Sequence, residues 1–77
     1  MRRTHGPFDY HTVWFHDNAA GCAGLDLMAT RDNVAKRVGR ITFWDAQGQF
    51  FLTLDAECPV TIIDTLIAEA RERIPTK

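Results

Sequence analysis

Histidine and aspartate side chains crowd one short stretch of this chain, residues 8–17, which reads FDYHTVWFHD. Imidazole and carboxylate groups bind metal ions and move protons, so this stretch is where chemistry would be expected first. In a strand, however, successive side chains point to opposite faces, which separates His11 from His16. One face then offers at most one histidine with Asp9 and Asp17, whereas zinc needs three or four ligands. We therefore expect no metal and no cofactor, and interpret the stretch as a strand.

Two cysteines, Cys22 and Cys58, supply the thiols of the chain. They lie far apart, and neither belongs to a C-x-x-C pair or to another metal-binding pattern. Cys22 follows His16 and Asp17 closely enough to make a Cys–His pair conceivable, but no neighbouring cation activates its thiol. We expect no catalytic residues, and hence a protein that is not an enzyme. Whether Cys22 and Cys58 form a disulfide stays open at this point.

The length and composition indicate one small globular domain over residues 1–77. The residues are 45% hydrophobic and 25% charged, which is typical of a soluble protein. The formal net charge of −1 gives no long-range attraction to nucleic acid or to an anionic membrane. No apolar run has the length of a signal peptide core or a membrane span. We expect a cytoplasmic protein with no membrane partner.

One local stretch of positive charge stands out against this balanced composition. It consists of Arg31, Lys36, Arg37 and Arg40, interrupted by Asp32. Such a stretch is usually a solvated face, and nucleic acid is an unlikely partner at this net charge. The alternative is a nucleic-acid-binding or antitoxin-type regulator that contacts phosphates through these four side chains.

The pattern of apolar residues and turn residues predicts strands in the first half of the chain. Residues 1–8 end in Gly6-Pro7 and are interpreted as a flexible lead-in. Residues 10–16 and 25–31 alternate or are rich in aromatic and β-branched side chains, which predicts two strands. Residues 32–39 fit either a strand with a bulge at Gly39 or a short helix. We favour the strand, which would continue to Asp45.

The stretch RITFWDAQGQFFLTLD, residues 40–55, is typical of a β-hairpin. Asp45 and Gly48 suit the ends of a type I turn. A four-residue loop would place Ile41, Phe43, Phe50, Leu52 and Leu54 together on the core face. The expected cross-strand pairs are then Arg40 with Asp55, Thr42 with Thr53, and Trp44 with Phe51.

The last element is predicted to be a helix that begins at Pro59 and stops at Pro75. Its apolar side chains recur at helical spacing, at Val60, Ile63, Ile67, Ala70 and Ile74, with Ile62 and Leu66 beside them. The resulting fold class is α+β: an antiparallel meander of about four strands, with one C-terminal helix packed on one face.

A single helix covers one face of such a sheet and leaves the other face open. We expect the open face to carry the interaction surface, made of Trp44, Phe51, Thr42, Thr53, Tyr10 and Trp14. Exposed aromatic rings on a sheet are typical of an interface. A second copy of the chain is the expected partner, and a small apolar ligand or another protein is the alternative. The sequence thus favours a non-enzymatic binding or protein-interaction protein that acts as a homodimer.

The C-terminal half also carries a resemblance. RVGRITFWDAQGQFFLTLD followed by CPVTIIDTLIAEARERI resembles the hairpin-then-helix of small uncharacterised α+β proteins of bacterial mobile elements, including integron gene cassettes. It is similar as well to antitoxins of HicB type, in which strands are followed by a helix. The resemblance implies the α+β fold and a bacterial setting, and it assigns no functional residue.

Overall fold

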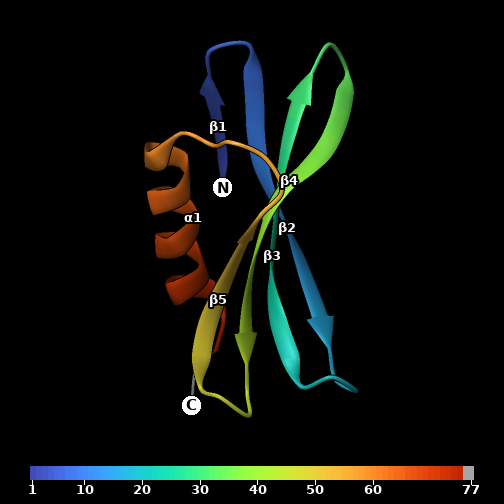
Figure 1. Cartoon of the computed structure of the whole chain (residues 1–77), viewed down its shortest axis with the longest axis vertical. Helices are drawn as coiled ribbons and strands as arrows, with labels where there is room; N and C mark the ends of the chain where they lie inside the picture. Colours follow the sequence, from blue (N-terminus) through green and yellow to red (C-terminus); the bar gives the residue numbers. More distant parts are fainter. Residues whose placement is uncertain (76–77) are drawn as a thin grey trace.

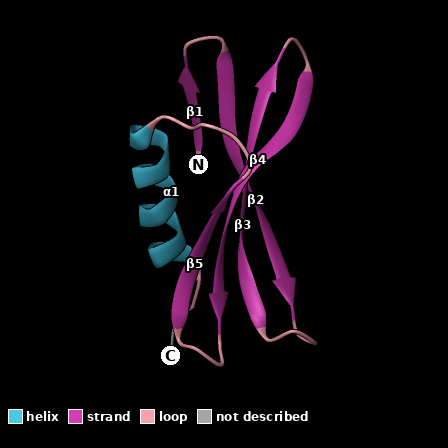
Figure 2. Cartoon of the chain, viewed as in Figure 1, coloured by secondary structure: helices cyan, strands magenta, loops and turns pink. Residues whose placement is uncertain are grey.

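The computed structural model describes residues 1–75 and contains five strands and one helix (Figure 2). In chain order the elements are β1 (Arg2–His5), β2 (Phe8–Asp17), β3 (Cys22–Arg31), β4 (Val34–Trp44), β5 (Gln49–Leu54) and α1 (Val60–Arg73). The strands form one antiparallel sheet in the order β1-β2-β3-β4-β5, so every strand lies beside its neighbour in sequence. The α+β fold with an antiparallel meander and a C-terminal helix is therefore confirmed.

The sheet is strongly twisted and curls like half a barrel, with β1 and β5 as its two edges (Figure 1). We call the side on which α1 packs the helix face, and the opposite side the outer face. The helix contributes Ile62, Leu66 and Ala70 to the core, and Ile74 joins them directly after the helix ends. Leu66 and Ala70 are both completely buried, so the apolar stripe is centred on them.

The N-terminal segment forms a strand, so the interpretation of residues 1–8 as a flexible lead-in is wrong. β1 pairs with β2 through a two-residue turn at Gly6 and Pro7. Gly6 has a φ of 59°, the positive value that the first central position of a type II′ turn requires. All four residues of β1 are polar and exposed, so the segment lacks the apolar alternation by which strands are recognised.

Residues 34–39 belong to β4, which confirms the strand with a bulge over the short helix. Leu27 pairs with Gly39 and Met28 pairs with Arg37, so Val38 is the extra residue at the bulge. The strand begins after a two-residue turn in which Asp32 and Asn33 have φ values of 52° and 65°. Aspartate and asparagine tolerate this left-handed conformation, which is typical of type I′ hairpins.

The β4–β5 hairpin has the expected loop length but a different register. Trp44 pairs with Gln49, so the loop consists of residues 45–48. Gly48, at φ 62°, closes the loop and donates a hydrogen bond from its N–H to the carbonyl oxygen of Trp44 at 2.9 Å. The positive φ places Gly48 at the last loop position, whereas the expected pairing made Gln49 the last loop residue. As a result, each residue of β5 faces a β4 residue two positions earlier than expected.

Candidate interaction surface

Four of the six expected surface residues lie together on the outer face. Thr42 and Trp44 project from β4, with Phe51 and Thr53 beside them on β5. The expected pairing of Trp44 with Phe51 is wrong, because Phe51 faces Thr42 and Trp44 faces Gln49. Arg40 likewise faces Thr53, not Asp55. Phe51 is exposed, Trp44 is half-buried and Thr42 is buried, so this face is already partly covered by its own side chains.

Tyr10 and Trp14 lie on the helix face, so their expected place on the outer face is wrong. Tyr10 pairs with Ala29 and is 5% exposed within the core. Trp14 pairs with Leu25, and the Arg73 guanidinium of α1 lies 5.9 Å from its ring centre. The loop between β2 and β3 has an even number of residues, which pairs even positions of β2 with odd positions of β3. Even-numbered residues of β2 therefore lie on the opposite face from the even-numbered residues at the end of β4, with which they were expected to share a face.

An ion pair and an aromatic ring occupy the centre of the outer face. Arg40 donates hydrogen bonds to both carboxylate oxygens of Asp26, at 2.5 and 3.0 Å. Its guanidinium also lies 4.2 Å from the ring centre of Phe15, which fits a cation–π contact. The hydrogen bond to Asp26 raises the pKa of Arg40 more than burial lowers it. Phe15 in turn covers Gly24, where any larger side chain would collide with the ring.

The basic stretch is largely neutralised within the molecule. Besides the pair of Arg40 with Asp26, Arg37 donates a hydrogen bond to Asp55 at 3.1 Å. Arg31 lies 3.8 Å from Asp32, and its guanidinium also lies 5.6 Å from the ring centre of Phe8. Exposed ion pairs of this kind contribute little to stability, but they reduce the positive field that a phosphate backbone would meet.

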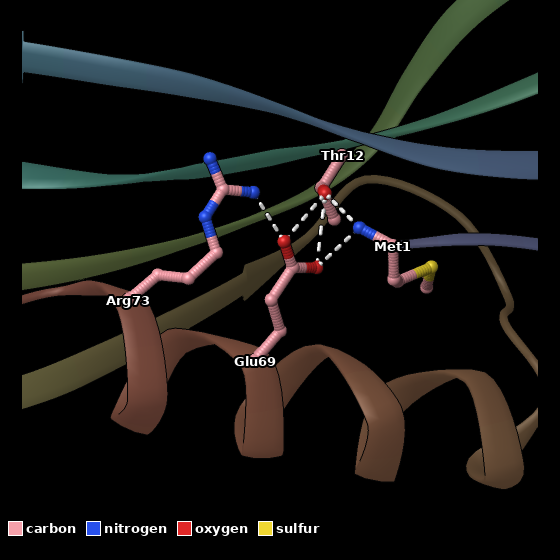
Figure 3. Close-up of polar contacts among 4 residues, drawn as sticks. All are labelled: Met1, Thr12, Glu69 and Arg73. Carbon is pink, nitrogen blue, oxygen red and sulfur yellow. Dashed lines mark hydrogen bonds and ion pairs between the residues drawn. The ribbon is translucent and has the colours of Figure 1, made fainter.

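A second polar cluster joins the N-terminus to the helix (Figure 3). The Met1 amine donates hydrogen bonds to the Thr12 hydroxyl and to Glu69, each at 2.7 Å. Thr12 donates to the same carboxylate at 2.9 Å, and Arg73 contacts it one helical turn away. Burial raises the pKa of Glu69, but the hydrogen bonds from the Met1 amine, Arg73 and Thr12 together lower it below its ordinary value of 4.5. The cluster therefore ties β1 and β2 to α1.

The three histidines do not converge. His5 is on exposed β1, and His11 and His16 project to opposite faces of β2, as expected from strand alternation. Among residues 1–75, no group of three or more His, Cys, Asp and Glu side chains is arranged to hold a metal ion. The expectation of no metal and no cofactor remains a prediction about the protein in solution.

The thiols are free, and Cys22 is among the residues that line a small cavity. Cys22 is buried, Cys58 is half-buried, and no disulfide joins them. The cavity has a volume of about 190 Å³ and is lined by His16, Cys22, Ala23, Phe43, Asp45, Ile74 and Pro75. His16 pairs with Ala23 and Cys22 with Trp44, so the imidazole and the thiol project to opposite faces of the sheet. Burial raises the pKa of Cys58, the opposite of the lowering that activates a nucleophilic thiol.

Strand β5 is the feature whose exposure the sequence did not indicate. Leu52 and Leu54 were expected in the core, and they do lie on the helix face, opposite Ile41 and Gly39. They nevertheless remain 42% and 48% exposed, and Phe51 on the outer face is 48% exposed. The helix packs toward the middle of the sheet, where its closest strands are β3 and β4. The predicted topology could have indicated this exposure. In a meander, the last strand has a neighbour on one side only, so its outer edge stays open.

The described residues thus offer the outer face, the cavity and β5 as places where a partner could bind. The single helix of residues 1–75, α1, does not have the length and hydrophobicity of a membrane-spanning segment. No family model, curated protein or solved structure matches this chain.

Proposed function

We propose that this chain is a non-enzymatic protein-interaction protein that acts as a homodimer. The observation that carries the proposal is the exposure of β5, a strand of sequence QFFLTL in which five of six residues are exposed. Phe51, Leu52 and Leu54 lie in sequence order on this strand and are all exposed large apolar side chains. Phe51 lies on the outer face, and Leu52 and Leu54 lie on the helix face, so this edge strand exposes large apolar side chains on both faces of the sheet. Large apolar side chains left exposed together on one short strand of a small protein are typical of an interface.

The small size of the core supports the same proposal. The fully buried side chains of large volume are Leu25, Leu27 and Leu66, which come from β3 and α1. A short chain buries a smaller fraction of its surface than a long one, and its stability is correspondingly low. A second copy that covers β5 would add apolar contacts beside the existing core and stabilise both molecules.

The nucleic-acid alternative receives less support from the charges. Three of the four cations of the basic stretch have carboxylate partners, so Lys36 is the member for which no ion pair is described. A fluorescence titration with mixed oligonucleotides at low and moderate salt separates the two functions. The interaction proposal predicts no binding at either salt concentration. Binding that weakens steeply with salt would favour the regulator.

The cavity beside His16 and Cys22 is the feature that favours an enzyme as a second candidate. A thiol enzyme requires a nucleophile and a base within hydrogen-bonding reach. Comparing the iodoacetamide alkylation rate of Cys22 in the folded protein with that in urea tests this alternative. The interaction proposal predicts slower alkylation in the folded state, because Cys22 is 7% exposed. Faster alkylation in the folded state would support a catalytic thiol.

Sedimentation equilibrium of the unsubstituted protein tests the proposed homodimer. We expect a reversible monomer–dimer equilibrium between low and high micromolar concentration. A single species with the monomer mass of 8.7 kDa throughout this range would contradict the homodimer.

A further inference from the structure

Strand β5 has an outer edge that no other part of residues 1–75 pairs with. The sheet order places β5 last, and β4 is its one strand neighbour. The strand contains no charged residue and no proline. Charged side chains, prolines and covering segments are the devices by which proteins keep edge strands from pairing with other chains. The β5 edge has none of these devices among the described residues.

The hydrogen bonding of the hairpin shows which backbone groups point outward. The N–H of Asp55 donates to the carbonyl oxygen of Val38 at 2.8 Å, which extends the β4–β5 register by one pair. In an antiparallel ladder the groups of alternate residues point toward the same neighbour. The N–H and C=O groups of Thr53 and Phe51 therefore face β4, like those of Asp55. The outward groups belong to the residues between them, namely Phe50, Leu52 and Leu54.

We propose that a second copy of this chain pairs with this edge, β5 against β5, antiparallel and with two-fold symmetry. A two-fold axis perpendicular to the sheet keeps both helix faces on the same side of the joined sheet. When Leu52 lies on the axis opposite Leu52 of the second copy, Phe50 faces Leu54 of that copy, and Leu54 faces Phe50. Each of these pairs exchanges two hydrogen bonds, so about six bonds satisfy all the outward groups.

The same register covers the exposed apolar side chains of β5. Leu52 meets its own counterpart, and Leu54 meets the half-buried Phe50 of the other copy, both on the helix face. Phe51 lies opposite Thr53 of the second copy on the outer face. All three exposed large apolar side chains of β5 thus gain a cross-strand contact. The register that satisfies the outward N–H and C=O groups is therefore the same register that covers the apolar side chains.

The opposite edge of the sheet explains why the assembly would close as a dimer. β1 is four residues long, and Arg2 and Arg3 make it positively charged. Two like-charged edges repel each other, and a β1–β5 contact between copies would place two arginines against an apolar strand. Open-ended stacking of copies is disfavoured for this reason. Pairing of β5 with itself uses one surface on each copy and leaves β1 at both ends of the joined sheet.

This inference rests on the proposed homodimer and specifies how the two copies join, so its test needs variants of β5. Leu52→Lys places two ammonium groups opposite each other at the axis, and Leu52→Glu places two carboxylates there. Val13→Lys is the matched control: Val13 is 46% exposed, close to the 42% of Leu52, but it lies on interior strand β2. Far-ultraviolet circular dichroism verifies the fold of each variant, and sedimentation equilibrium gives its dissociation constant.

We expect Leu52→Lys and Leu52→Glu each to raise the dissociation constant at least a hundredfold, and Val13→Lys to change it less than threefold. An equimolar mixture of the Lys and Glu variants should recover the dimer, because the opposite charges then face each other. A dimer that Leu52→Lys and Leu52→Glu leave unchanged would overturn β5 pairing while the homodimer itself stands. An unsubstituted protein that stays monomeric would overturn both.

Discussion

A methyl group added at Gly24 should destabilise the fold, although glycine is normally unfavourable within a strand. An ideal Cβ atom at this position would lie 2.1 Å from the carbonyl oxygen of Ile41 and 2.7 Å from two ring carbons of Phe15. The Ile41 carbonyl belongs to the β3–β4 ladder, where Ile41 pairs with Leu25, so it cannot retreat without loss of hydrogen bonds. The ring of Phe15 could retreat only by moving away from the Arg40 guanidinium.

The expected cost of Gly24→Ala is about 3 kcal/mol, at the upper end of the range for overpacked sites, because a backbone atom must move. A domain of this length has a free energy of unfolding of about 4–12 kcal/mol, so the loss is large. Gly39→Ala is the matched control. Its Cβ would lie 3.1 Å from Cδ2 of Leu54, the end of a flexible and exposed side chain, and 3.3 Å from the carbonyl oxygen of Thr53, which needs to move only slightly. A smaller unfolded-state entropy favours alanine there by about 0.4–1 kcal/mol, so the net change should stay within about 1 kcal/mol.

Urea unfolding followed by tryptophan fluorescence measures both changes. All samples need the same protein concentration, because self-association makes the midpoint depend on concentration. The prediction is a lower midpoint for Gly24→Ala with an unchanged slope, and a midpoint close to that of the wild type for Gly39→Ala. If Gly24→Ala cost less than about 1 kcal/mol, Phe15 would not cover β3 as described, and the arrangement of the outer face would be wrong.

Four further substitutions test the contacts between the helix and the sheet and the outer-face ion pair. Leu66→Ala should cost about 3–4 kcal/mol in urea unfolding, and the half-buried Ile67→Ala about 1–2 kcal/mol, because Leu66 is fully buried. Glu69→Gln should cost about 2–4 kcal/mol at neutral pH. Because the pKa of Glu69 is lowered in the folded state, its charge stabilises the fold at any pH above its ordinary pKa of 4.5. This stabilisation is lost as the pH falls through the folded pKa. In a pH series of unfolding curves, the free energy of unfolding of the wild type should therefore approach that of Glu69→Gln in acid. Asp26→Ala should cost about 1–3 kcal/mol by the same assay, since it removes both hydrogen bonds of Arg40.

Local patterns in the sequence were sufficient to predict the elements from β2 to α1. The helical spacing of apolar residues indicated α1, and the alternation around Asp45–Gly48 indicated the β4–β5 hairpin. The bulge in β4 also follows from the sequence, because the apolar residues stand at even positions up to Val38 and at odd positions from Ile41 onward. Such patterns are local, and each of them depends on side chains within one strand, one turn or one helix.

The features that the sequence did not predict depend on loop lengths and on contacts between distant segments, neither of which is specified within one strand or helix. β1 is polar throughout and is held by the Met1 amine, whose partner Glu69 lies at the other end of the chain. The face on which Tyr10 and Trp14 lie depends on the loop between β2 and β3. Because this loop has an even number of residues, even positions of β2 pair with odd positions of β3. The exposure of Leu52 depends on where along the sheet α1 packs, and no local pattern in β5 contains that information.

Amide hydrogen exchange of the unsubstituted protein at two concentrations tests the β5 pairing most directly. At a concentration where the protein is monomeric, the amides of Phe51 and Thr53 should be protected by β4, and those of Phe50, Leu52 and Leu54 should exchange quickly. At a concentration where the dimer dominates, these three amides should become protected, while those of Phe51 and Thr53 change little. Rapid exchange of Phe50, Leu52 and Leu54 in the dimer would show that the two copies do not join through β5.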